Sequence, residues 1–128
     1  MKKKILLIDD DDDILRSFQV ILENKGFNIL TAKEGVSGYE LLVKENPDAL
    51  ILDIMMTSNL EGYNLLHQIK QNKEFSQLPI IIMTGMRDQM GVNLYSAVED
   101  NELFPNVRFQ DKPADPNEIA DILNEMLK

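Results

Sequence analysis

Four short segments of the chain that we expect to be strands each lead directly into a side chain that could do chemistry. These are an acidic pair, a single aspartate, a hydroxyl and a lysine: Asp9 with Asp10, Asp53, Thr84 and Lys112. Carboxylate oxygens are the ligands that hard divalent cations prefer, and a lysine ammonium can pair with a phosphoryl oxygen. If the four segment ends lie together, the set can hold a divalent cation and a phosphoryl group.

The pattern of elements predicts that these ends do lie together. Short apolar runs alternate with segments whose apolar residues recur at helical spacing. Strands are expected over 4–8, 27–31, 49–53, 79–83 and 107–111, and helices over 14–25, 34–45, 61–72, 88–101 and 115–127. Strands that alternate with helices form a parallel sheet covered on both faces. The carboxyl ends of such strands share one edge, where α/β proteins bind ligands.

Composition limits the class of protein. The chain has 128 residues, 44% of them apolar, which predicts one domain with a substantial core over residues 1–128. A net charge of −9 argues against nucleic acid and anionic membrane as partners, because both favour basic surfaces. The chain has no cysteine, which fits a reducing cytosol. Its basic start, Lys2–Lys4, is followed by too short an apolar run for a signal peptide. A cytoplasmic location is therefore expected.

Each polar residue has an ordinary structural explanation when taken alone. Acidic residues after position 9 could simply cap the first helix and favour its dipole. Thr84 could bond to backbone, and Lys112 could be a solvated charge. Asp9 and Asp10 fit this explanation less well, because another carboxylate nearby would repel them unless a cation were present. Five such residues at four strand ends on one sheet edge make a functional site the better hypothesis.

Four segments in this order resemble the receiver domain of two-component response regulators over essentially the whole chain. They are Lys4–Asp11, Leu52–Met56, Pro79–Gly85 and Asp111–Pro113. The resemblance implies a flavodoxin-like (βα)5 three-layer sandwich, with a parallel five-stranded sheet in the order 2-1-3-4-5. It also implies a cis bond before Pro113. A receiver takes a phosphoryl group onto aspartate and is not a turnover enzyme.

The same resemblance assigns roles to residues of this chain. Asp53 is similar to the phosphoacceptor, Lys112 to the phosphate-contacting lysine, and Thr84 with Phe109 to the switch pair. The implied cofactor is Mg²⁺, or Mn²⁺, and its implied ligands are Asp10, Asp53, the Met55 carbonyl and, through a water, Asp9. The implied phosphodonor is a sensor histidine kinase or a histidine phosphotransfer protein. The implied output is a downstream protein that binds the fourth helix, fifth strand and fifth helix.

Three departures from the family pattern affect the expected loops and switch. Thr57 stands where a proline is usual, and the loop 57–62 is one residue longer than is common. The stretch 85–110 is also long, with 102–105 inserted before the last strand, which predicts an unusual signalling face. Phe109 lacks a hydroxyl, so a switch there works by packing alone.

Two methionines bear on the lifetime of a phosphorylated form. Met55 and Met86 stand two residues after Asp53 and Thr84, at positions that in receivers flank the path of the hydrolytic water. Apolar side chains there predict slow self-dephosphorylation.

Two other functions share some of these sequence features. A phosphatase of the haloacid dehalogenase type also uses an aspartate and Mg²⁺, and Asp9–Asp11 superficially offers its motif. However, Asp13 does not fit that motif, and the chain is too short for a cap domain. A receiver-like binding module without phosphorylation would normally have lost an acidic residue or the lysine, and this chain keeps them.

Overall fold

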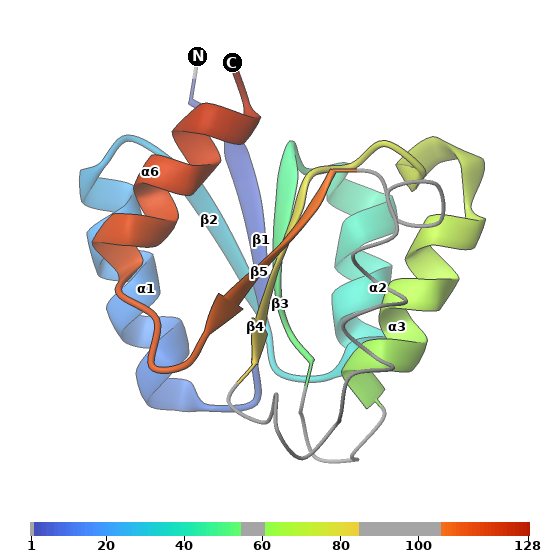
Figure 1. The fold of residues 1–128 in the computed structure, drawn as a ribbon. Coiled ribbons are helices and arrows are strands. Elements are labelled where there is room, and N and C mark those ends of the chain that lie inside the picture. Colours follow the sequence, from blue (N-terminus) through green and yellow to red (C-terminus); the bar gives the residue numbers. More distant parts are fainter. Residues whose placement is uncertain (1, 55–60, 85–105) are drawn as a thin grey trace.

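The computed structural model describes residues 2–54, 61–84 and 106–128, which form a parallel sheet between two layers of helices (Figure 1). The strands are β1 (Lys4–Ile8), β2 (Asn28–Ala32), β3 (Ala49–Asp53), β4 (Ile80–Thr84) and β5 (Val107–Asp111), in the order β2-β1-β3-β4-β5. All four strand pairs are parallel. The expected flavodoxin-like topology is therefore confirmed.

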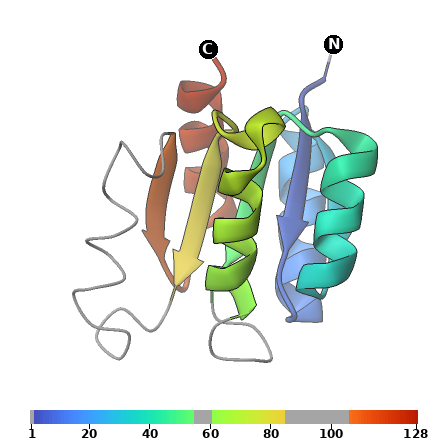
Figure 2. The same ribbon diagram turned by 90° about the vertical axis from the view of Figure 1, so that its right-hand side faces the viewer.

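Helices cover both faces of the sheet. They are α1 (Asp12–Asn24), α2 (Gly35–Glu45), α3 (Glu61–Gln71) and α6 (Pro116–Met126), with a short 3-10 helix, η1 (Lys73–Phe75), before β4. Figures 1 and 2 show α1 and α6 on one face and α2 and α3 on the other. The expected helix over 88–101 and the insertion at 102–105 lie outside the described residues.

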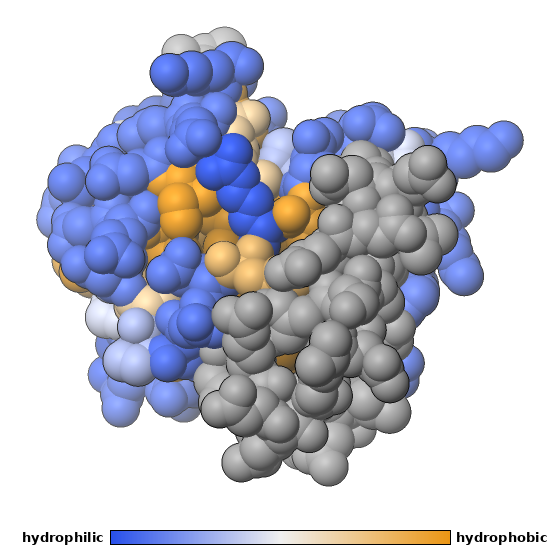
Figure 3. Space-filling model, viewed as in Figure 1, coloured by the Kyte–Doolittle hydropathy of each residue, from blue (hydrophilic) through white to orange (hydrophobic). Residues whose placement is uncertain are grey.

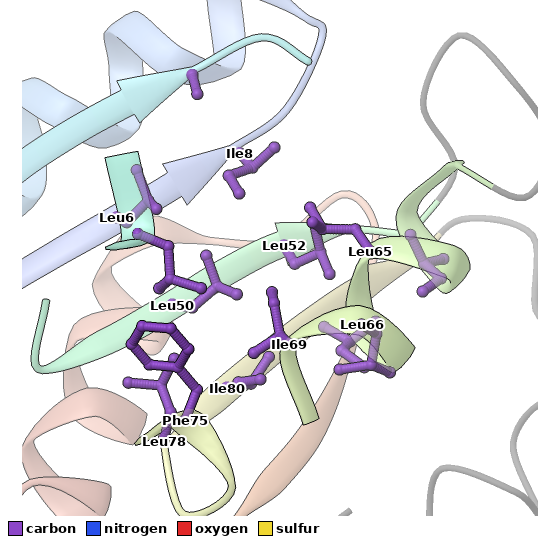
Figure 4. Packing of buried hydrophobic residues seen from close by; sticks show 14 residues of the cluster. Leu6, Ile8, Leu50, Leu52, Leu65, Leu66, Ile69, Phe75, Leu78 and Ile80 are labelled. Atoms are coloured by element: carbon purple, nitrogen blue, oxygen red, sulfur yellow. The ribbon is translucent and has the colours of Figure 1, made fainter. Parts of the chain in front are cut away.

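Alternation along the strands divides the core between the two faces. Leu6 and Ile8 belong to the apolar cluster under α2 and α3, whereas Ile5 and Leu7 belong to the cluster under α1 and α6. This division follows from the two-residue period of a strand. In Figure 4, Leu66 and Ile69 of α3 are among the side chains that pack against the sheet.

Local signals set the helix ends. Asp11 caps α1 by accepting from the backbone N–H groups of Asp13 and Ile14, so the helix begins two residues earlier than predicted. Gly26, with φ of 99°, follows the end of α1 in the left-handed conformation that glycine tolerates best. Asp115 caps α6, with Pro116 in its first turn as expected.

The surface contrasts with this interior. Figure 3 shows that hydrophilic side chains dominate the face formed by α1 and α6, while apolar residues reach the surface mainly near the centre of the view. Among the described residues, no helix is both long and apolar enough to cross a bilayer.

Candidate functional site at the carboxyl edge of the sheet

Asp53 is the last residue of β3, a strand whose five residues are all buried. Its strand lies between β1 and β4, so the carboxylate stands at the middle of the sheet edge. Asp53 is only 2% exposed. A charged carboxylate is costly to bury unless a cation or hydrogen-bond donors accompany it, so the residues around it decide whether it can stay ionised.

Two more carboxylates follow β1 on the adjacent strand. Asp9 is fully buried, and its Oδ1 accepts from the backbone N–H of Asp11 at 2.9 Å. Asp10 is exposed. One carboxylate oxygen from each of Asp9, Asp10 and Asp53 lies within 4.8 Å of the other two. The predicted acidic cluster is therefore formed, with two buried members and one that faces solvent.

Lys112 follows β5 and joins the two buried carboxylates. Its Nζ lies 3.2 Å from Asp9 Oδ2 and 3.2 Å from Asp53 Oδ2. The bond from Lys112 to Pro113 is cis, as the sequence predicted. Burial alone would lower the pKa of Lys112, but the charges of Asp53 and Asp9 outweigh burial and raise that pKa above its ordinary value of 10.5. Lys112 therefore stays charged at neutral pH.

The charges of this site favour a divalent cation. Among the described residues, three carboxylates lie near one ammonium, which leaves an excess negative charge when all three are ionised. Oxygens on opposite sides of an octahedral Mg²⁺ lie about 4.2 Å apart, and Mg²⁺ usually takes one or two carboxylates and keeps several waters. A cluster within 4.8 Å matches that requirement after small side-chain movements. The donor set therefore fits a hydrated Mg²⁺ or Mn²⁺.

The other predicted site residues are only partly described. Thr84 is the last residue of β4 and pairs with Asp111 of β5, so its backbone lies at the same sheet edge. Phe109 pairs with Ile82, is half-buried, and packs against the apolar cluster under α2 and α3. Met55 and Met86 lie outside the described residues. So does the loop that begins at Thr57, up to the start of α3 at Glu61.

Sequence reasoning missed one close contact beside Asp53. Gly62, in the first turn of α3, lies against the backbone carbonyls of Asp53 and Ile54. A glycine inside a helix costs about 1 kcal/mol relative to alanine. In the sequence, a glycine stands inside a predicted helix shortly after the candidate acceptor. That pattern could have indicated that the helix packs closely against the backbone near the acceptor.

Comparisons with known proteins agree with this geometry. The family model of the response regulator receiver domain matches residues 5–124. The chain is 32% identical to the "Probable transcriptional regulator ycf29" of Pyropia yezoensis, over 99% of this chain and 54% of that protein. It is 29% identical to the alkaline phosphatase synthesis transcriptional regulatory protein PhoP of Bacillus subtilis (strain 168), over 93% of this chain and 46% of that protein. The chain thus spans about half the length of these relatives.

The fold also matches solved structures. The chemotaxis protein CheY4 of Vibrio cholerae superposes with a TM-score of 0.83 at 19% identity, over 99% of this chain and 100% of that one. This likeness concerns the fold, whereas the family match concerns the sequence.

Proposed function

Because the chain belongs to the response regulator receiver domain family, we propose that Asp53 accepts a phosphoryl group from the phosphohistidine of a sensor histidine kinase or a histidine phosphotransfer protein, in a reaction that requires Mg²⁺ or Mn²⁺. The observation that carries this proposal is the buried Asp53 carboxylate, held 3.2 Å from the Lys112 ammonium beside the carboxylates of Asp9 and Asp10.

The proposed step is a displacement at phosphorus. A carboxylate oxygen of Asp53 attacks and an O–P bond forms, while the P–N bond of a phosphohistidine whose other ring nitrogen is protonated breaks. The electron pair goes to the departing nitrogen, so the leaving group is a neutral imidazole. Two negative groups must approach, so their repulsion has to be neutralised. Lys112 would move its ammonium from the Asp53 carboxylate to a phosphoryl oxygen while staying near Asp9. Positioning and charge neutralisation would then supply the catalysis.

The metal would be held by residues already gathered at this edge. Asp10 and Asp53 would be direct ligands together with the Met55 carbonyl, and Asp9 would act through a water. When bound, Mg²⁺ would neutralise charge on the phosphoryl oxygens. The hydrogen bond from the Asp11 N–H to Asp9 Oδ1, 2.9 Å long, would keep the Asp9 side chain oriented toward the site.

A pocket beside Lys112 would receive the phosphodonor. Its apolar lining includes Ile14 and Phe18 of α1, and Pro113 and Ala114 of the connection between β5 and α6. An apolar surface next to the reacting groups suits a helix that carries the phosphohistidine. Ile14→Asp should therefore slow transfer from a histidine kinase that phosphorylates the chain, and leave phosphorylation by acetyl phosphate unchanged.

Phosphorylation would signal through a packing change. The new phosphoryl oxygens would draw in the Thr84 hydroxyl, and Phe109 would turn toward the space that Thr84 leaves. Phe109 is half-buried against the core and lies in β5, so its movement would alter the surface formed by the expected fourth helix, β5 and α6. The partner there would be a downstream protein. The relatives named as transcriptional regulators are about twice as long as this chain, so control of transcription would require further sequence.

Intact mass after incubation with acetyl phosphate tests the proposal. The chain should gain one phosphoryl group only when Mg²⁺ or Mn²⁺ is present, and Asp53→Asn should gain none. Asp12→Asn is the matched control, because Asp12 is an acidic residue outside the cluster, paired with Lys33 at 3.0 Å. Equal modification of the Asp53→Asn variant would place the acceptor elsewhere. No modification of the wild type would favour a receiver-like binding module instead.

The haloacid dehalogenase alternative has no support beyond Asp9–Asp11, since the matched family is the receiver domain. Receiver domains are generally not turnover enzymes, so the chain should retain one phosphoryl group and release phosphate only at the slow rate of self-dephosphorylation.

A further inference from the structure

Gly62 contacts the backbone directly after the candidate acceptor. A Cβ atom built on Gly62 would lie 2.6 Å from the carbonyl oxygen of Asp53 and 2.6 Å from the carbonyl carbon of Ile54, and it would also overlap the Ile54 carbonyl oxygen. Real Cβ atoms essentially never come within 3.0 Å of such neighbours. Only glycine therefore allows the first turn of α3 to approach β3 this closely.

The kind of atom that a side chain would meet distinguishes this glycine from another buried one. A Cβ on Gly38 of α2 would meet the Cδ1 of Ile8 at 2.5 Å, but that atom is the end of a flexible side chain. Rotation of Ile8 can relieve the overlap. At Gly62 the obstacle is backbone, so relief requires a shift of the peptide groups of Asp53 and Ile54, or of α3 itself.

The neighbouring strand of the sheet also holds this backbone. The N–H of Ile54 donates to the Met83 carbonyl of β4 at 3.1 Å, and the Ile54 side chain is fully buried. The end of β3 is therefore in contact with both β4 and the bare Cα of Gly62. This stretch of backbone fixes where the Asp53 carboxylate starts and where the chain enters Met55, whose carbonyl is a proposed metal ligand.

We propose that Gly62 is a positioning residue for metal binding and phosphoryl transfer, acting through its contact with the backbone of Asp53 and Ile54. The proposal rests on the function proposed above for Asp53. An added Cβ must move about 0.4 Å away from the carbonyl oxygen of Asp53, the difference between 2.6 and 3.0 Å, to reach even the closest tolerated contact. Displacements of this size matter where a carboxylate must meet a metal and a reacting phosphorus in line.

Gly62→Ala tests the proposal, with Gly38→Ala as the matched control. Both are buried helical glycines that gain one methyl group. The measurements are Mg²⁺ affinity by calorimetry and the initial rate of phosphorylation by acetyl phosphate, well below the melting temperature of each variant. Gly62→Ala should weaken Mg²⁺ binding and slow phosphorylation by about tenfold or more, the range found when supporting residues of metal sites are changed. Gly38→Ala should stay within about twofold of wild type.

A merely structural role would affect stability without affecting these two readouts. If Gly62→Ala is partly unfolded, trimethylamine N-oxide restores the compact state, and the defects should persist in the folded protein. Folded Gly62→Ala with affinity and rate within twofold of wild type overturns the proposal. A variant that stays unfolded under these conditions also overturns it, because Gly62 is then a requirement of the fold. Absence of phosphorylation in the wild type is a different result, and it counts against the proposed function.

Discussion

Removal of the Lys112 ammonium should destabilise the protein and make its stability depend strongly on Mg²⁺. Lys112 lies 3.2 Å from each of two carboxylates that are 0% and 2% exposed, and its own side chain is 24% exposed. Loss of one partner from a fully buried ion pair costs about 3–5 kcal/mol. Because Lys112 retains some contact with water, Lys112→Ala should lose about 3 kcal/mol of unfolding free energy without metal.

Urea unfolding in the presence of a chelator measures this loss. Lys33→Ala is the control, because Lys33 forms an exposed ion pair with Asp12 at 3.0 Å, and such pairs contribute about 1 kcal/mol or less. The titration is then repeated with Mg²⁺, which stabilises the native state by about 2.7 kcal/mol at a hundredfold excess over Kd. Under the proposed metal site, the ammonium and the metal contact the same carboxylates, so Mg²⁺ should bind Lys112→Ala more tightly than wild type and restore most of its lost stability.

Two results would refute this reasoning. A loss in Lys112→Ala no larger than that in Lys33→Ala would mean that the buried carboxylates do not depend on the ammonium. An equal or smaller gain from Mg²⁺ in Lys112→Ala than in wild type would mean that the ammonium and the metal do not share the carboxylates.

Three further results are expected. Asp10→Ala should weaken Mg²⁺ binding and phosphorylation of Asp53 together, since a proposed ligand is lost; calorimetry that shows unchanged affinity would contradict this role. Burial lowers the pKa of Lys70 from 10.5 to about 8. Between these two pH values the unfolded chain keeps a proton on Lys70 that the folded chain has lost. The free energy of unfolding should therefore rise with pH from about 8 to 10.5. Urea unfolding at several pH values should show this rise in wild type and not in Lys70→Met. Replacement of Met55 by Asn and Met86 by Glu should shorten the phosphorylated lifetime, because polar groups can orient the hydrolytic water; a longer lifetime would count against that expectation.

Much of the fold could be predicted because three of its strands, β1, β3 and β4, are largely buried. The expected strands agree with the structure within one residue at each end, including Ala49–Asp53. A fully buried strand requires an unbroken apolar run, and helices on both faces require helical spacing between the runs. The placement of the five candidate side chains at one edge of the sheet then followed from parallel topology alone. The short helix at Lys73–Phe75 was not predicted, because a single turn carries no periodicity.

The detailed geometry of the site was beyond sequence reasoning. Asp9 and Asp10 are adjacent and identical in type, yet one is fully buried and the other is exposed. That difference depends on the turn after β1, in which the N–H of Asp11 binds Asp9. Likewise, the bridge from Lys112 to both buried carboxylates depends on how the end of β5 approaches β1 and β3. Such contacts depend on tertiary positions of about an ångström, which residue types do not encode.

The charge balance explains why this edge of the sheet can respond to phosphorylation. Two buried carboxylates share one ammonium, and that ammonium belongs to the residue directly after β5. A phosphoryl group on Asp53 would add negative charge and new acceptor oxygens at one end of this bridge. Lys112 would have to shift toward them, and it is joined through Pro113 to the start of α6. One side chain, Lys112, therefore links the proposed chemistry at β3 to the proposed signalling surface at β5 and α6. A conservative Lys112→Arg change should allow metal binding while altering the response of that surface to phosphorylation.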